Sequence, residues 1–536
     1  MLDCRKGGRA AECGGLENRW VMSPGGSNPS PSALCLVTGV RCLRTELLGY
    51  EAGMGVINRV LDAQPVLSLA DYLSGGGGEA LVAARKVDPE AVVGTIEDSG
   101  LRGRGGAGFP TATKWRSVLA NASAAQPTPV VINGAEGEPS TFKDRTILRT
   151  NPYRVLEGAL VACAVVSAVE LVICTKRSFL PERSRLRGAV DELRAEGWLE
   201  GIDVRFVDGP DAYLFGEETA LLEVTQNRQP FPRVSPPWRR GISDGSTNSA
   251  SRVTIGDSTG DESAPALVNN VETFANVALI VRNGPAWFRE VGTDKSPGTI
   301  CCTIVGDVSH HGVAEFAMGT TLREVIETIG KGALADRQIV AVLPGASGAV
   351  VPEALFDTPL THEAMAAAGA MLGSAGFHCI DDHADPLLLA YGASRFLSTE
   401  SCGQCTPCKG DGLALTALLS GLVDGTAPVD IAKRVRSRLE SVVNEARCGL
   451  ALQQQVVVGS LVARCGDLSV ARTVTPPEEF VAGRRRVLLP LLDIADGVAV
   501  FDEHESEKQA DWSFDAVSSG AYPAQHLQGV ALDAAS

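Results

Sequence analysis

The sequence predicts an α/β fold that continues into a smaller mixed domain and a helical bundle. From Pro129 onward, short apolar runs rich in β-branched residues alternate with helix-length segments, which is typical of α/β proteins. Beyond Gly298, strand-like runs flank a single helix. Residues 386–470 then favour helices, with apolar side chains four positions apart at Leu387 and Tyr391.

The chain is long enough for several domains. Its first 53 residues contain clusters of Pro, Gly and Ser without the ordered parts of a signal peptide, so we expect a disordered extension. Met54 begins a more regular sequence and is a candidate start. The predicted segments are the extension (1–53), the α/β domain (54–295), the small mixed domain (296–385), the helical domain (386–475) and a C-terminal tail (476–536).

Within the α/β domain, Pro129–Asn133 is predicted as a buried strand whose carboxyl end carries polar residues, where open α/β sheets usually bind ligands. A helix over 154–169 and a strand over 171–174 follow. Residues 239–265 are rich in Ser, Gly, Asp and Thr, which predicts a long surface loop.

The small mixed domain is predicted to contain strands over 299–305 and 338–343 around a helix over 321–329. This order of elements fits a β-grasp-like domain. The tail after Pro476 is acidic and contains no cysteine, which excludes an appended ferredoxin module there.

Composition excludes some classes of function. With 48 Lys and Arg against 64 Asp and Glu, the net charge is −16, which argues against a nucleic-acid-binding protein. The longest apolar stretch, Ala159–Val169, is shorter than the roughly 18 residues that span a bilayer, so we expect no direct membrane insertion. Five cysteines in apolar surroundings are expected in the core: Cys163, Cys174, Cys301, Cys302 and Cys379.

Four other cysteines have the spacing of metal ligands. Cys402, Cys405 and Cys408 form a C-x₂-C-x₂-C run, and Cys448 follows alone. Three such thiolates can hold one face of a [4Fe–4S] cluster while a distant fourth completes it. Zinc is the alternative, but zinc sites usually pair two C-x₂-C knuckles or combine Cys with His, and neither pattern is evident. We therefore predict a cluster that carries single electrons.

A glycine-rich stretch, Gly100–Trp115, is a candidate phosphate-binding loop. Its glycines let the backbone approach a phosphate closely, and Arg104 and Lys114 offer positive charge. The alternative is a flexible turn, because a strand directly before it and an acidic residue about twenty positions after it are missing. On its own, this motif leaves both interpretations open.

Four further motifs follow in order. They are NGAEGEP (133–139), TFKDR (141–145), FGEETALL (215–222) and VNNVET (268–273). With the glycine-rich stretch and the cysteines, this set resembles the NADH- and flavin-binding subunit of respiratory complex I, a family that includes diaphorase subunits of NAD-linked hydrogenases and formate dehydrogenases. The resemblance implies a Rossmann-like FMN/NADH-binding domain, a β-grasp domain of the ubiquitin-like, SLBB type, and a helical domain with a [4Fe–4S] cluster.

The resemblance also implies hydride transfer from NADH to FMN, one-electron transfer to the cluster, and transfer through partner subunits to a quinone or other acceptor. The residues implied for FMN are Gly103, Arg104, Gly105, Lys114, Asn133, Gly216, Asn269, Asn270 and Thr273. Those implied for NADH are Gly106, Ala107, Gly108, Phe109, Glu138 and Glu218, with Phe109 as a stacking face and Glu138 as a hydroxyl acceptor. Cys448 is implied as the fourth cluster ligand, with Cys465 as its rival.

Glu136 and Glu217 are candidate catalytic residues, because buried carboxylates near a flavin can shift its potential. For Glu217 and Glu218 the alternative is an acidic pair at a helix start, stabilised by the helix dipole. Tyr213 and Trp238 fit a site role and a packing role equally well.

Three departures from the family pattern concern the cofactor sites. Ala135 replaces an aspartate expected to bond the flavin, Ser117 replaces an aromatic, and Pro236–Arg239 reads Pro-Pro-Trp-Arg instead of Pro-Pro-Phe-Pro. Losing one stacking face would weaken NADH binding several-fold without abolishing it. Two function classes therefore stay open: an NADH-oxidising electron-input enzyme, and a non-catalytic cluster-bearing or nucleotide-sensing subunit that has lost FMN.

The partners implied by the resemblance are a small [2Fe–2S] subunit and a larger iron–sulfur subunit. We expect a cytoplasmic protein, with any contact to the cytoplasmic face of the membrane made through those partners. NADH rather than NADPH is the expected substrate.

Overall fold

The structure is a computed structural model that describes residues 55–123, 126–242, 264–468, 488–506 and 508. The chain divides into two units, Met1–Gly53 and Met54–Ser536, and all described residues belong to the second. The predicted extension over 1–53 and most of the loop predicted over 239–265 lie outside the described residues.

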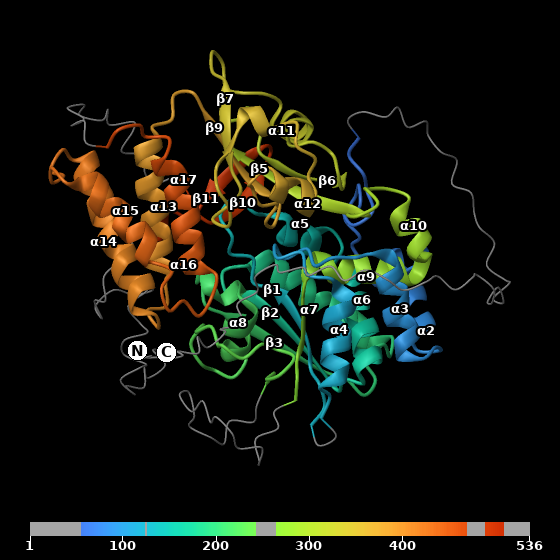
Figure 1. Cartoon of the computed structure of the whole chain (residues 1–536). Helices are drawn as coiled ribbons and strands as arrows, with labels where there is room; N and C mark the ends of the chain where they lie inside the picture. The colour runs from blue at the N-terminus through green and yellow to red at the C-terminus, as the bar shows by residue number, and fades with distance from the viewer. Residues whose placement is uncertain (1–54, 124–125, 243–263, 469–487, 507, 509–536) are drawn as a thin grey trace, which may run out of the picture. The chain divides into compact units, whose positions relative to one another are not determined.

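A four-stranded parallel sheet forms the α/β part and confirms the predicted fold class (Figure 1). Its order is β3-β2-β1-β4, with β1 (Val130–Gly134), β2 (Glu170–Lys176), β3 (Asp203–Gly209) and β4 (Leu267–Asn270). Val130 of the central strand pairs with Leu171 on one side and with Leu267 on the other. The chain leaves β1 toward β2 and later returns to its other side at β4, so the strand order reverses at β1.

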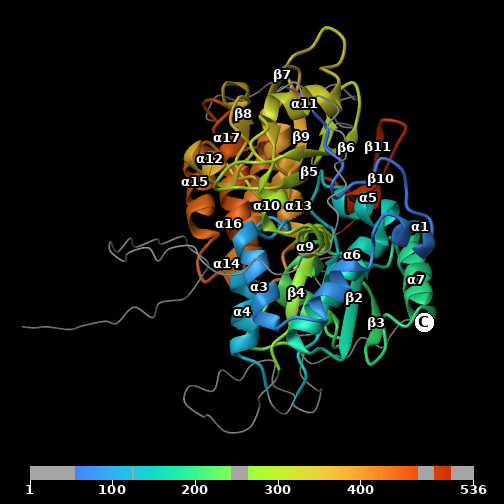
Figure 2. The ribbon, with the colours of Figure 1, turned by 90° about the vertical axis from the view of Figure 1, so that its right-hand side faces the viewer.

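Helices pack on this sheet or on one another. They are α1 (Leu69–Ser74), α2 (Glu79–Ala84), α3 (Pro89–Ser99), α4 (Thr111–Ala120), α5 (Lys143–Thr150), α6 (Pro152–Val166), α7 (Leu180–Ala195), α8 (Glu218–Val224), α9 (Val271–Asn283) and α10 (Pro285–Arg289). The predicted helix over 154–169 corresponds to α6, whose start is set by Pro152 and by the Asn151 side chain, which accepts from Arg154 N. Helices α6 and α9 pack against each other in the core (Figure 2).

Gly158 marks a close approach of α6 and α9. A Cβ at Gly158 would lie 1.9 Å from the backbone oxygen of Phe274, which cannot rotate away. We expect Gly158→Ala to lower the free energy of unfolding in urea by about 3 kcal/mol. Gly188→Ala in α7 is the matched control, because nothing lies within 4 Å of its Cβ and the change should stabilise by up to about 1 kcal/mol. Equal stabilities would contradict this packing.

A mixed five-stranded sheet follows, close to the predicted strand positions. Its order is β6-β5-β9-β7-β8, with β5 (Thr299–Gly306), β6 (Gly312–Ala317), β7 (Ile339–Leu343), β8 (Val351–Pro352) and β9 (Gly376–Asp381). The predicted helix over 321–329 is α11 (Leu322–Gly330), which begins at a capping box formed by Thr321 and Glu324. A shorter helix, α12 (His362–Ala367), precedes β9.

Helices occupy the region from 386 to 462, as predicted (Figure 1). They are α13 (Pro386–Glu400), α14 (Thr406–Val423), α15 (Ile431–Ser441), α16 (Leu450–Gln453), a π-helical segment (Gln454–Val458) and α17 (Gly459–Val462). Leu415 and Leu419 of α14 are fully buried in their shared core.

The C-terminal tail contains a β-hairpin that was not predicted. Its strands are β10 (Leu491–Ala495) and β11 (Val498–Phe501), joined by Asp496 and Gly497. Both turn residues have positive φ, 51° and 77°, as a two-residue hairpin turn requires. An Asp-Gly pair between short apolar runs is a signal that could have predicted this hairpin. Figure 2 shows it beside α5.

The five cysteines expected in the core are all buried, which confirms that prediction. Among the residues that the structure describes, no helix is both long enough and apolar enough to cross a membrane.

Candidate functional site

The carboxyl ends of β1 and β4 bring several predicted site residues together. Asn133 near the end of β1 is the register partner of Asn270 at the end of β4. The strand order reverses between these strands, and open α/β sheets bind ligands at such points. The Asn133 side chain donates to the Gly216 oxygen (2.9 Å), which brings the 3₁₀ turn Tyr213–Gly216 to the same edge.

The glycine-rich stretch forms a closed loop between α3 and α4. Gly103 N donates to the Phe109 oxygen (2.8 Å). Gly106 and Gly108 have φ of 115° and 61°, which an L side chain rarely adopts. Ala107 is exposed and Phe109 is half-buried, so both are accessible from outside the loop.

This loop lies against the strand ends on one side and against α12 on the other. A Cβ on Gly105 would lie 3.2 Å from Asn270 Cβ, and one on Gly108 would lie 2.3 Å from the His362 ring. Burial, together with nearby Arg102, lowers the pKa of His362 to about 3, so this ring is neutral. The tight packing leaves room only for glycine at Gly108.

Lys114 of α4 reaches the strand ends. Its Nζ donates to the Val268 oxygen (2.8 Å) and forms an ion pair with Glu218. In its satisfied orientation, the Asn269 amide oxygen accepts from Trp115 Nε1 (2.8 Å), which fixes α4 against the end of β4. Lys114 therefore carries positive charge to the place where the strand-end amides meet.

The side chain of Arg104 differs from the expected arrangement. Its guanidinium is 2 % exposed and donates to the oxygens of Thr299 (3.1 Å) and Pro297 (3.3 Å). It also donates to the Arg102 oxygen within the glycine-rich stretch (3.3 Å), while Arg104 N donates to Thr273 Oγ1 of α9 (2.9 Å). The charge that we expected here at a phosphate is therefore directed into the protein, and an FMN contact of Arg104 stays a prediction.

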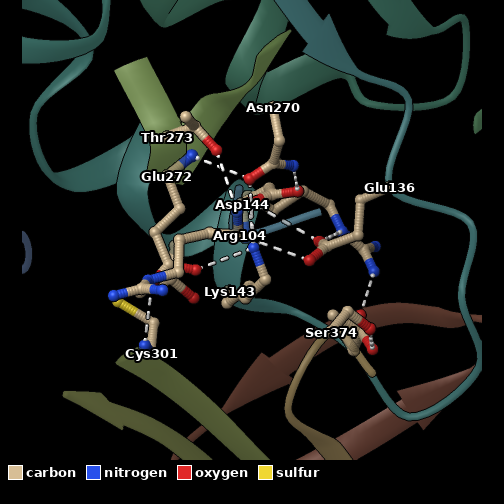
Figure 3. Close-up of polar contacts among 12 residues, drawn as sticks. Arg104, Glu136, Lys143, Asp144, Asn270, Glu272, Thr273, Cys301 and Ser374 are labelled. Atoms are coloured by element: carbon tan, nitrogen blue, oxygen red, sulfur yellow. Dashed lines mark hydrogen bonds and ion pairs between the residues drawn. The ribbon is translucent and has the colours of Figure 1, made fainter. Parts of the chain in front are cut away.

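A buried charged cluster of Lys143, Asp144 and Glu272 supports the end of β4 (Figure 3). Lys143 Nζ lies 2.7 Å from Asp144 Oδ1 and 2.8 Å from Glu272 Oε2, and the Asn270 side chain donates to Asp144 Oδ2 (2.6 Å). Burial alone would lower the pKa of Lys143, but the two carboxylates outweigh it and raise that pKa. The cluster fixes the orientation of Asn270.

Glu136 is held by the start of α5 (Figure 3). It accepts from Asp144 N (3.0 Å) and from Arg145 Nε (3.0 Å). The roles of Lys143, Asp144 and Arg145 were not predicted, although three adjacent charges at the start of a helix within the TFKDR motif were a usable signal. The catalytic role of Glu136 stays a prediction.

Glu217 caps helix α8, as the alternative interpretation of this acidic pair predicted. Its carboxylate accepts from Thr219 N (3.0 Å) and Ala220 N (2.8 Å). Burial raises its pKa, although these hydrogen bonds oppose the shift. A catalytic role for Glu217 stays a prediction.

Glu138 is enclosed by two separate parts of the chain. Its carboxylate accepts from Tyr213 Oη (2.6 Å) and from Ala346 N (2.6 Å), and burial raises its pKa. Gln453 of the helical region donates to the same Tyr213 oxygen (3.0 Å). Tyr213 contacts Glu138 and also packs edge-on against Phe396, whereas Trp238 packs against the core of the α/β part. A site role of Tyr213 stays a prediction.

The four predicted cluster ligands line one pocket. Cys402, Cys405 and Cys408 share its wall with Cys448, and Leu214 and Pro232 complete it from the α/β part. Cys465 is not among the lining residues, and its Sγ lies 3.5 Å from the Leu461 oxygen. This arrangement favours Cys448 over its rival.

Polar groups surround these cysteines. The Ser401 hydroxyl lies 3.3 Å from Cys408 Sγ, and Gln404 Nε2 donates to Cys402 Sγ (3.5 Å). Burial raises the pKa of Cys408 to about 11, and iron would supply the charge that converts such a thiol to a thiolate. Among the residues that the structure describes, no group of three or more Cys, His, Asp or Glu side chains is arranged to hold a metal ion. The pocket, its four thiols and its sulfur-directed donors fit a cluster.

Comparisons with known proteins match two regions of this chain to known domains. Residues 96–279 match the Nuo51 FMN-binding domain, and residues 389–471 match the NADH-ubiquinone oxidoreductase-F iron-sulfur binding region. The chain is 36 % identical over 364 residues to an F-type subunit of the NADH-quinone oxidoreductase of Rhizobium meliloti, covering 66 % of this chain and 82 % of the relative. It is 32 % identical to NADP-reducing hydrogenase subunit HndC of Solidesulfovibrio fructosivorans, covering 72 % and 76 %.

A solved structure is similar as well. A chain of an NAD⁺-reducing [NiFe]-hydrogenase in the H₂-reduced state superimposes with a TM-score of 0.63 at 30 % identity, over 78 % of this chain and 70 % of that one. Fold and site thus define a flavin- and iron–sulfur-dependent oxidoreductase that takes up electrons from NADH. More particularly, the chain belongs to the family of F-type subunits of NADH-quinone oxidoreductase, the FMN-binding electron-input subunits with a 4Fe–4S binding region. The predicted family, function and cofactors are confirmed.

Proposed function

We propose that this chain oxidises NADH at the joined ends of β1 and β4 and delivers the electrons singly, through the cysteine pocket, to partner iron–sulfur subunits and finally to a quinone. FMN, when bound, supplies the conversion of a two-electron hydride into single electrons. The residues of the chain bind and orient the two nucleotides and keep water away from the redox centres.

One observation supports this proposal above the others. The 3₁₀ turn Tyr213–Gly216 belongs to both sites: Leu214 lines the cysteine pocket, and the Gly216 oxygen is bonded to Asn133 at the strand ends. A flavin at the strand ends and a cluster among the cysteines would therefore be separated by one short turn. That proximity is what electron transfer between them requires.

The loop residues divide into roles for the two nucleotides. We assign to FMN the loop glycines, the Lys114 ammonium and the strand-end amides, which neutralise phosphate and hydrogen-bond the flavin. We assign Phe109 to stacking on NADH, and Glu138 and Glu218 to its hydroxyl groups. Glu136, held rigidly by Arg145, places a negative charge beside the flavin position.

The cluster ligands are proposed as the four cysteines of the pocket, at 402, 405, 408 and 448. The five-stranded sheet supports a β-grasp domain, because its strands follow the order second, first, fifth, third and fourth with one helix after the second strand. The helices after residue 386 then form the cluster domain. We propose a small [2Fe–2S] subunit and a larger iron–sulfur subunit as partners. The chain would then be cytoplasmic, and these partners would hold it at the cytoplasmic face of the membrane.

The test is the absorption spectrum of anaerobically purified protein, with flavin and iron quantified, before and after NADH is added. Bound flavin and about four irons per chain, both bleached by NADH, are expected. Iron without flavin, and no response after FMN is supplied, would favour the non-catalytic alternative. Ala135 is the residue that favours this alternative, because its buried side chain has no hydrogen-bonding group where the family pattern has an aspartate.

Lys114→Met is expected to weaken FMN binding about 10- to 150-fold, because one hydrogen bond to a charged group contributes about 1.5–3 kcal/mol. The dissociation constant can be measured by flavin fluorescence on protein stripped of FMN. Arg116→Met is the matched control on the same helix, since Arg116 pairs with exposed Glu90 and Glu97 and should leave FMN affinity unchanged. Equal affinities of the two variants would refute the phosphate role.

A further inference from the structure

The C-terminal hairpin continues into a segment that ends at the junction of the two proposed redox sites. This segment lies beyond residue 471, where the match to the iron–sulfur family model ends. At its end, Lys508 Nζ donates to the Asp211 oxygen (3.1 Å) and to the Glu400 carboxylate, and it pairs with Glu505 (2.7 Å). The family match gives these contacts no role.

Glu400 joins the cysteine loop to the nucleotide turn. It is the last residue of α13, two positions before Cys402. Its Oε2 accepts from Tyr213 N (2.6 Å), the first residue of the turn that lines the cysteine pocket with Leu214. The Glu400 carboxylate therefore connects the end of α13, beside Cys402, with the start of the 3₁₀ turn Tyr213–Gly216. Lys508 contacts both sides of this connection, through Glu400 and through the Asp211 oxygen.

The lysine is needed because two carboxylates are buried together. The side chains of Glu400 and Glu505 are 5 % and 2 % exposed, and that of Lys508 is 11 % exposed. Two carboxylates in so dry a place repel each other unless a cation lies between them. Without the ammonium, the Glu400 carboxylate would be pushed away from Glu505 and toward water, and that movement loosens its bond to Tyr213 N.

Arg395 of α13 holds the segment in place. Its guanidinium donates to the oxygens of Glu505 (3.2 Å), Ser506 (2.7 Å) and Lys508 (2.8 Å). Three carbonyls gathered on one guanidinium fix the backbone around Lys508, so the position of its ammonium is set by the fold. The helix that ends at the cysteines thus also anchors the lysine that stabilises its own last residue.

We propose that Lys508 is a positioning residue for electron transfer: through Glu400, it fixes the separation between the flavin-side turn and the cluster loop. The proposal rests on the proposed function. With FMN and a cluster bound at the two sites, one electron would pass from the reduced flavin to the oxidised cluster. No bond forms or breaks, and neither Lys508 nor Glu400 exchanges a proton. The rate of such a transfer falls as the separation of the two centres grows, so a turn or loop that moves away from its partner slows it.

The test uses the full-length protein loaded with FMN and cluster, mixed rapidly with NADH. In Lys508→Met, flavin reduction is expected at the wild-type rate, whereas cluster reduction is expected to slow several-fold. Lys508→Arg should restore much of that rate, because it keeps the cation. Lys433→Met, an exposed lysine in α15 of the helical region, is the matched control and should change neither rate.

A purely structural role would slow both phases together or reduce cofactor content, so the split between the phases identifies positioning. If Lys508→Met fails to fold, the double variant Lys508→Met/Glu505→Gln is the substitute. It removes one buried negative charge while Glu400 still lacks the Lys508 ammonium. It should show unchanged flavin reduction and slowed cluster reduction as well. Cluster reduction at the wild-type rate in either cofactor-loaded variant would overturn this proposal and leave the proposed function untouched. Wild-type protein that takes up no flavin would overturn the proposed function, and this proposal with it.

Discussion

A Cys448→Ser variant should be purified without its iron–sulfur cluster. Cys448 lies in the same pocket as the other three thiols, and the pocket offers no fifth cysteine to replace it. A serine hydroxyl is a poor substitute for thiolate on iron. Iron per chain should fall from about four to below about one, and the electron paramagnetic resonance signal of the reduced cluster should disappear.

Cys465→Ser is the control for this result. Cys465 belongs to the same helical region and is also half-buried, but it does not line the pocket. Its substitution should leave iron content and the cluster signal intact, and NADH should still bleach the flavin in both variants because the strand-end site is untouched. Retained iron in Cys448→Ser, with iron lost in Cys465→Ser, would reverse the ligand assignment.

Local pattern was enough to predict most of the fold. The β-branched run at 129–133 and the strand-like runs at 299–305 and 338–343 correspond to β1, β5 and β7, because buried strands need continuous apolar surface. The hairpin over 491–501 was missed, although its Asp-Gly turn signals the reversal, because its strands are short and follow a polar stretch. Short elements of this kind depend on the surface against which they pack.

The candidate site was predicted where a motif states chemistry directly, and missed where function depends on long-range pairing. The cysteine spacing identified three of the thiols that line one pocket, and the resemblance to the family pointed to the fourth, Cys448. By contrast, the Arg104 guanidinium meets carbonyls about 195 positions away, and Glu400 meets both Tyr213 and Lys508. Nothing local in the sequence states such pairings, because they arise only when separate segments of the fold come together.

Lys143→Met is expected to destabilise the protein by about 3–5 kcal/mol, because it removes the cation that lies between buried Asp144 and Glu272 and leaves only Arg104, 4.0 Å from Glu272, beside the pair. The lysine and Glu272 side chains are 1 % and 0 % exposed, so water cannot compensate. The free energy of unfolding in urea measures the loss, and exposed Lys86→Met is the control that should change it by less than about 0.5 kcal/mol. Equal stability of the two variants would show that the cluster contributes nothing.

The pH dependence of this variant separates lost charge pairing from lost packing. Burial already raises the pKa of Asp144 in the folded state, and loss of the ammonium that opposes this shift raises it further above its value in the unfolded state. The unfolded chain then binds fewer protons over that interval, so stability must fall as the pH rises through it. Lys143→Met should therefore lose less stability relative to wild type at about pH 5 than at about pH 8, and adding Glu272→Gln should recover part of the loss at the higher pH. A loss that is the same at both pH values would instead assign the effect to the missing aliphatic chain, since packing takes up no protons.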